Sequence, residues 1–247
     1  MSALEKPPVD SRAGVAARHG WQLPEVHPEG RKFVLAAAAL AFISFFVWNF
    51  LTWPLVALTL GVAAFFRDPV RVTPQAEDVL ISPADGLVAL VERVVVPVEI
   101  AGEAGLGAQR LVRVSIAMSL FDVHVNRTPI AGTVRQLVYI SGRFLSSDID
   151  KSSDENERQY IVIEGRDHRR VGMTQIAGMV ARRIVSFVKP GDMVAAGQRV
   201  GIIRFGSRVD LYVPDDMTAQ VTPGQRVIAG ETVIARVGNG PSRAICH

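Results

Sequence analysis

A glycine-serine pair interrupts a strand-like stretch near the end of the chain, which reads RFGSRVDLYVP over residues 204–214. Glycine weakens a strand and often marks a bulge, so a bulge with a solvent-facing serine is one interpretation. The other interpretation is chemical. The Ser207 hydroxyl can attack the carbonyl of Gly206, because glycine has no side chain to block the approach and tolerates the strained backbone that the attack requires.

A serine nucleophile needs a general base, most often a histidine that a carboxylate holds in orientation. Two other stretches supply these groups: His124 lies in SLFDVHVNRTPIAG, and Asp85 lies in ISPADGLV. Each also has a purely structural interpretation. His124 can be a buried strand histidine, and Asp85 can belong to an Asp-Gly hairpin turn. Ser207, His124 and Asp85 are the candidate catalytic set.

The composition argues against several other kinds of site. The 247 residues carry a net charge of +3, which suits an anionic membrane surface or ligand. The chain lacks the motifs and dense Lys/Arg patterning of nucleic-acid-binding proteins. Cys246 is the only cysteine, and no two of the five histidines have the i, i+4 spacing of a helical metal site. We therefore expect no nucleic-acid partner and no metal.

Residues 33–66 contain no charged side chain in 34 positions, which is typical of a membrane-associated segment. Pro54 interrupts the middle of this segment and predicts two helices, over about 33–48 and 54–66. Positive residues flank both ends, which favours a hairpin with both ends in the cytoplasm. One long tilted span is the alternative.

The remaining chain is β-rich, with short Val-, Ile- and Leu-rich runs separated by Gly, Pro and Asp. Residues 172–183 are less strand-like and indicate a short helix. We predict a mainly β (α+β) fold, in which a β-rich catalytic domain with hairpin or barrel-like repeats follows an apolar helical hairpin. The predicted regions are a polar tail (1–32), the helical hairpin (33–66) and the catalytic domain (67–247).

An internal repeat relates KPGDMVAAGQRVGII (189–203) to TPGQRVIAGETVIAR (222–236). Each copy has a Pro-Gly turn, a short strand, an Ala-Gly turn and a second strand, a pattern that predicts a hairpin. Biotinyl and lipoyl carrier domains have similar hairpins, so a membrane-tethered β-barrel carrier or adaptor without catalysis is an alternative function. Those carriers present a lysine at a hairpin tip, and the stretch between the two copies has none.

Six motifs, in order, resemble the phosphatidylserine decarboxylase proenzymes of the short bacterial type. The motifs are FFRDPVR (65–71), SPADG (82–86), FDVHVNR (121–127), DENER (154–158), QIAGMVARRIV (175–185) and FGSRVDLYVP (205–214). The resemblance extends over nearly everything from residue 31 onward. Any one motif is weak, whereas six in order behind an apolar segment are specific.

The resemblance implies self-cleavage between Gly206 and Ser207, giving chains 1–206 and 207–247 that stay associated. Ser207 would become a pyruvoyl group, the cofactor, which forms a Schiff base with the amine of phosphatidylserine and accepts electrons as carbon dioxide leaves. His124 is then the base and proton donor, and Asp85 orients it. Phe205, Phe121 and Tyr212 are candidate walls of the substrate pocket.

The same resemblance implies a zymogen of phospholipid biosynthesis that makes phosphatidylethanolamine. It also implies a homodimer at the inner cell membrane, with its catalytic domain on the cytoplasmic side. Two further alternatives remain open at this point. One is a membrane-anchored metallohydrolase using His124, and the other is a relative that cleaves itself without decarboxylating.

Overall fold

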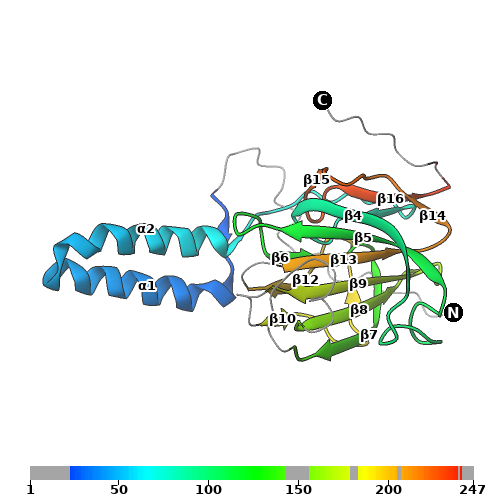
Figure 1. Cartoon of the computed structure of the whole chain (residues 1–247), viewed down its shortest axis with the longest axis horizontal. Helices are drawn as coiled ribbons and strands as arrows, with labels where there is room; N and C mark the ends of the chain where they lie inside the picture. Colours follow the sequence, from blue (N-terminus) through cyan, green and yellow to red (C-terminus); the bar gives the residue numbers. More distant parts are fainter. Residues whose placement is uncertain (1–22, 143–155, 179–182, 205–206, 239, 241–247) are drawn as a thin grey trace.

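The computed structural model describes residues 23–142, 156–178, 183–204, 207–238 and 240. Two apolar helices extend from one side of a β-rich body, on the side that carries β6 (Figure 1). The prediction of a mainly β fold preceded by apolar helical structure is confirmed.

Helix α1 (Pro28–Val47) and helix α2 (Asn49–Phe65) pack against each other as a hairpin. They are separated only by Trp48, whose φ of −142° and ψ of 81° break the helical path. The expected start of the second helix at residue 54 is wrong, because Pro54 lies inside α2 near its beginning. Pro54 is the sixth residue of α2, so the helix lacks the hydrogen bond that a backbone N–H there would donate to the carbonyl of Phe50.

The helices expose large apolar side chains around most of their surface, including Phe46, Phe50 and Trp53. At 1.5 Å per residue, α1 is about 30 Å long and α2 about 26 Å long. Of the described helices, only α1 has the length and composition of a membrane-crossing helix. An exposed apolar surface of this extent marks a protein or membrane interaction site.

An eight-stranded antiparallel sheet forms the largest layer of the body, in the order β11-β7-β8-β9-β13-β5-β4-β15. Its strands are β4 (Gly86–Val95), β5 (Arg110–Met118), β7 (Gly132–Ile140), β8 (Arg158–Glu164), β9 (Arg170–Ala177), β11 (Met193–Val194), β13 (Ser207–Val213) and β15 (Arg226–Val227). Strand β13 lies inside this sheet, paired with β9 on one side and β5 on the other.

Two three-stranded sheets, ordered β10-β12-β6 and β14-β16-β3, complete the body, and a short pair β1-β2 adjoins the hairpin. Their strands are β1 (Glu25–Val26), β2 (Arg67–Asp68), β3 (Val79–Ile81), β6 (Val125–Arg127), β10 (Ile184–Ser186), β12 (Arg199–Ile203), β14 (Met217–Ala219) and β16 (Val233–Val237).

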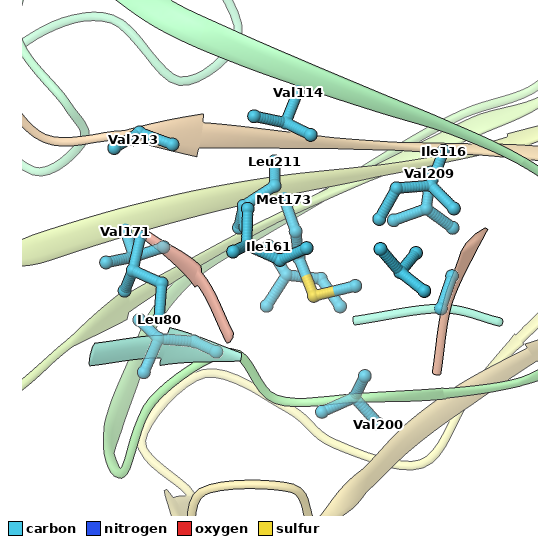
Figure 2. Close-up of a cluster of buried hydrophobic side chains, with 14 of the residues drawn as sticks. Leu80, Val114, Ile116, Ile161, Val171, Met173, Val200, Val209, Leu211 and Val213 are labelled. Atoms are coloured by element: carbon cyan, nitrogen blue, oxygen red, sulfur yellow. The ribbon is translucent and has the colours of Figure 1, made fainter. Parts of the chain in front are cut away.

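The main core lies between the large sheet and the small sheets. Alternate residues of β13, among them Val209 and Leu211, are fully buried on one face of the large sheet. Leu80 of β3 and Val200 of β12 close this core from the other side (Figure 2). The opposite face of the large sheet carries a second, smaller core that includes Tyr160 and Tyr212.

The two repeat copies are arches rather than hairpins, which corrects the prediction. In the first copy β11 pairs with β7 in the large sheet, whereas β12 pairs with β6 and β10. In the second copy β15 pairs with β4, whereas β16 pairs with β3 and β14. Each arch therefore joins one edge of the large sheet to a different small sheet.

The short helix expected over residues 172–183 is also wrong for the part that the structure describes. Residues up to Ala177 continue β9, which pairs with β8 and β13 along its length. Two strand neighbours and burial on both faces outweigh the weak strand propensity of Gly and Ala in this segment.

Gly197 lies in the turn of the first arch, against the segment before β3. Substituting it tests how much this close packing contributes to stability. Its φ is +74°, and a Cβ atom there would lie 2.1 Å from the Thr73 hydroxyl oxygen. We expect Gly197→Ala to lower the free energy of unfolding by about 1–3 kcal/mol more than Gly191→Ala does. Gly191 is the matched control, because it has a φ of +93° and open space around it. Equal losses in chemical unfolding would show that the contact with Thr73 is unimportant.

Candidate active site

His124 lies at the end of the loop that joins β5 to β6, and its side chain is fully buried. Its Nδ1 atom is 2.9 Å from the backbone carbonyl oxygen of Asp122. Because a carbonyl can only accept, the neutral ring donates from Nδ1 and leaves the Nε2 lone pair free. Nε2 is buried and has no hydrogen-bond partner among the described residues.

Burial lowers the pKa of His124 to about 4. The hydrogen bond to the Asp122 carbonyl and the Asp122 charge oppose this shift, and the positive charge of Arg67 adds to it. The ring of Phe65, the last residue of α2, covers the imidazole with a centroid distance of 4.1 Å. At neutral pH the site therefore holds an uncharged imidazole that can accept a proton.

Ser207 is the first residue of β13, with Met118 and Ala177 as its strand neighbours. The backbone N–H of Ile203, at the end of β12, donates to the carbonyl oxygen of His124 over 3.2 Å. Ser207 is four positions after Ile203, so their Cα atoms are about 14 Å apart at most. The hydrogen bond to Ile203 therefore limits how far the backbone of the candidate nucleophile lies from that of the candidate base. Gly206 lies outside the described residues.

Asp85 makes different contacts from those that a simple triad predicts. One carboxylate oxygen accepts from Arg71 over 2.7 Å, and the other accepts from the backbone N–H of Ala229 over 2.7 Å. Asp85 makes no hydrogen bond to His124 in the described structure, where the Asp122 carbonyl takes the Nδ1 position instead. Gly86, the next residue, passes close to the carbonyl of Ala117 at the Ser207 end of β5.

The segment that follows α2 binds the site at several points. Besides the Phe65 contact, Arg67 donates to the carbonyl of Phe121 in the loop before His124. Asp68 forms ion pairs with Arg127 over 3.3 Å and with Arg199 over 2.6 Å. Arg71 then reaches Asp85. The helical hairpin is therefore attached directly to the elements that carry the candidate catalytic residues.

The charges in this attachment are largely removed from water. Burial, with the nearby charge of Arg199, lowers the pKa of Arg127 to about 10, and Asp68 partly compensates. Arg127 also donates to the carbonyls of Gly197 and Pro69. Because a buried charge that loses its partner is costly, these contacts resist separation of the segment from the body.

Phe121 and Tyr212, the two predicted pocket residues that the structure describes, differ in burial. Phe121 is 84% exposed, so it lines no enclosed pocket in the described structure. Tyr212 is buried in the second core and lies five residues along β13 from Ser207, about 17 Å away at 3.3–3.4 Å per residue. This position does not support the pocket role predicted for Tyr212, which stays a prediction. Phe205 lies outside the described residues.

A buried chain of amides near the site is absent from the predicted set. The Gln159 amide donates to Gln175 over 2.9 Å, and the Gln175 amide donates to Asn126 over 2.8 Å. Asn126 in turn contacts the sulfur of Met118, the strand neighbour of Ser207. All three amides are at most 2% exposed. Gln175 lies in the motif QIAGMVARRIV and Asn126 in the motif FDVHVNR. Their place in these motifs was the sequence feature that could have identified them as site residues.

Among the residues that the structure describes, no group of three or more His, Cys, Asp or Glu side chains is arranged to hold a metal ion. The fold and the site define a β-rich enzyme with a buried neutral histidine and an attached apolar helical hairpin.

Comparisons with known proteins agree with the motifs. The family model described as phosphatidylserine decarboxylase matches residues 58–235. A phosphatidylserine decarboxylase proenzyme of Novosphingobium aromaticivorans is 55% identical over 90% of this chain and 90% of its own length. Proenzymes of Erythrobacter litoralis and Zymomonas mobilis are 55% and 50% identical, each over 89% of this chain and over 90% and 89% of their own lengths. The chain belongs to the phosphatidylserine decarboxylase family, whose members are carboxy-lyases.

Removing the Phe65 ring tests whether the hairpin controls the state of His124. We expect Phe65→Ala to raise the pKa of His124 from about 4 toward 6.5, because water then reaches the imidazole. NMR titration of the histidine ring protons measures this, with the His124 signal assigned from a His124→Gln variant. Phe33→Ala is the matched control, because Phe33 stacks on Phe66 instead. An unchanged His124 pKa in Phe65→Ala would contradict the assignment.

Proposed function

We propose that this chain cleaves itself between Gly206 and Ser207 and then decarboxylates phosphatidylserine to phosphatidylethanolamine. The observation that carries the proposal is the buried Nε2 atom of His124, which has no partner among the described residues. The backbone carbonyl of the same histidine accepts from Ile203, four positions before Ser207. Membership of the family, and the proenzyme names of the relatives, support both steps.

The self-cleavage begins when His124 Nε2 takes the proton of the Ser207 hydroxyl. The oxygen attacks the Gly206 carbonyl carbon, and the amide bond to Ser207 is replaced by an ester. Removal of the Ser207 α-proton then expels the Gly206 carboxylate and leaves a dehydroalanine at residue 207. Hydrolysis of that residue releases ammonia and leaves a pyruvoyl group. A histidine with a free lone pair in a dry site suits the first proton transfer.

Asp85 is proposed as a positioning residue of this site. Its two oxygens join Arg71, in the segment after the hairpin, to the backbone of Ala229, in the future 207–247 chain. This bridge supports a role in holding the two chains in register around Ser207. The Asp122 carbonyl, rather than Asp85, holds the His124 ring.

The cleaved chains would remain associated because β13 is an inner strand. It pairs with β5 from Ser207 to Val213 and with β9 from Ser207 to Tyr212. The proposed scissile bond precedes this strand, so cleavage and loss of the Ser207 nitrogen affect only the pairing of residue 207 and leave the ladder from residue 208 onward. Strands β15 and β16 add further pairing with β4 and β3 of the larger chain.

In the decarboxylation, the pyruvoyl group supplies the electron sink for the loss of carbon dioxide. His124 is proposed to return a proton to the α-carbon, because its Nε2 can alternate between the two states. The buried surroundings of His124 support exclusion of bulk water. The helical hairpin would hold the domain at the bilayer, where the lipid headgroup is presented.

Membrane association is proposed to involve insertion of α1 and α2 from the cytoplasmic side of the inner membrane. Arg31 and Lys32 at the start of α1, and Arg67 after α2, place positive charge at the common base of the hairpin, which supports this orientation. The homodimer expected from the resemblance stays a prediction.

Intact-mass measurement of the purified protein tests self-cleavage. We expect two chains, 1–206 and 207–247, the smaller with a pyruvoyl N-terminus that blocks Edman degradation, and co-elution of both in mild detergent. Ser207→Ala should give one uncut chain, because it removes the attacking oxygen. Ser115→Ala, which removes a buried serine hydroxyl from the neighbouring strand β5, is the matched control and should cleave. One uncut wild-type chain would contradict the proposal.

The pH dependence of self-cleavage tests the role of His124. With a pKa of about 4, the base form persists down to that pH and is lost below it. We expect the rate in freshly synthesised precursor, followed on gels, to be flat from pH 8 to about 5 and to fall near 4. His124→Gln should slow cleavage at least about 100-fold. A rate that already halves near pH 6.5 would show that a different group, or a solvated histidine, acts as the base.

A further inference from the structure

The loop between β5 and β6 presents two adjacent apolar side chains to the outside, although its histidine is buried. Leu120 is 57% exposed and Phe121 is 84% exposed. Single exposed apolar residues are common and need no explanation. An adjacent pair that continues a larger apolar surface indicates a binding face.

Three contacts place this loop at the base of the helical hairpin. Arg67 donates to the Phe121 carbonyl and also to the Ala64 carbonyl in the last turn of α2. Val123 packs in one cluster with Phe65 and Phe66. The exposed pair Leu120-Phe121 therefore lies where the apolar surface of the hairpin meets the body.

Exposed cations surround the same place. Arg31 and Lys32 are exposed at the start of α1, and Arg226, 72% exposed at its side chain, binds Asp122 of the loop itself. Apolar side chains beside lysine and arginine are the combination that binds the surface of an anionic bilayer.

We propose that Leu120 and Phe121 insert into the surface of an anionic phospholipid bilayer beside the helical hairpin. Leu120 and Phe121 would then contact the bilayer, while His124, three residues after Phe121, stays hydrogen-bonded to the Asp122 carbonyl inside the protein. Insertion of the loop sets the depth of His124 relative to the headgroups. This inference deepens the proposed function, since it relies on a lipid substrate to explain why that depth matters.

Site-directed fluorescence tests the insertion directly. The full chain, with Cys246→Ser, carries Phe121→Cys labelled with the polarity-sensitive dye NBD and is reconstituted in vesicles of equal parts phosphatidylglycerol and phosphatidylcholine. We expect a blue-shifted emission and at least about threefold stronger quenching by headgroup-region spin-labelled lipid than at the control position. A label at residue 121 that a water-soluble quencher reaches as readily as the control would overturn the proposal.

Val98→Cys is the matched control. Val98 is 83% exposed and lies in the β4–β5 connection, beyond the ends of the strands at Val95 and Arg110. The loop with Phe121 leaves β5 at the other end, next to Met118. Eight residues of β5 separate the two ends, about 27 Å at 3.4 Å per residue.

A second variant keeps the inference separate from the proposed function. In Leu120→Ser/Phe121→Ser we expect the bulk lipid concentration for half-maximal decarboxylation to rise about tenfold, with a smaller change in the rate at saturating lipid. Val95→Ser/Val98→Ser should change neither. Equal lipid dependence in both variants would overturn the inference. Self-cleavage is scored by mass in every sample, so a failure of maturation or of decarboxylation in the unmutated chain would count against the proposed function instead.

Discussion

The packing of Phe65 on His124 is the contact on which the rest of the molecule depends. It joins the last residue of the helical hairpin to the side chain best suited to proton transfer, and it is part of the burial that lowers the pKa of His124 to about 4. The ion pairs of Asp68 with Arg127 and Arg199 then fix the same segment on the body. The hairpin is for this reason part of the site rather than a separate attachment, and its position and the protonation of His124 are coupled.

The β-rich fold could be predicted because its strands are short apolar runs between turn residues, a local signal. The errors have a common physical origin, since tertiary contacts override local preference. Pro54 lies in the second turn of α2, where the helix continues despite the lost hydrogen bond and packs along α1. The segment ending at Ala177 is a strand because it has two strand neighbours. The repeat copies form arches because their strands pair with strands that are remote in the sequence. The repeat pattern itself does not show which strands pair.

The candidate site was predictable in part. Motif order identified Ser207, His124 and Asp85 as candidates, and the structure joins the backbone of His124 to Ile203, four positions before Ser207. The atom that orients His124 is the backbone carbonyl oxygen of Asp122. Because every residue has a backbone carbonyl, the sequence cannot show which one binds the histidine. Tyr212 is near Ser207 in the sequence, but an extended strand places the two residues about 17 Å apart, which residue order alone does not show. Asp85 contacts Arg71 and Ala229, which are more than a hundred residues apart in the sequence. The spacing of residues within a motif cannot predict such contacts.

Strand β13 sits between β9 and β5, in the interior of the sheet. If the bond before Ser207 is cut, the mature protein becomes two molecules whose native arrangement was reached while they were one. Its first folding is unimolecular, whereas any later refolding requires a 41-residue fragment, residues 207–247, to find its partner and enter the middle of a sheet. The recovery of denatured mature enzyme is then dependent on concentration, and the lifetime of the enzyme is governed by how slowly it unfolds rather than by how well it refolds.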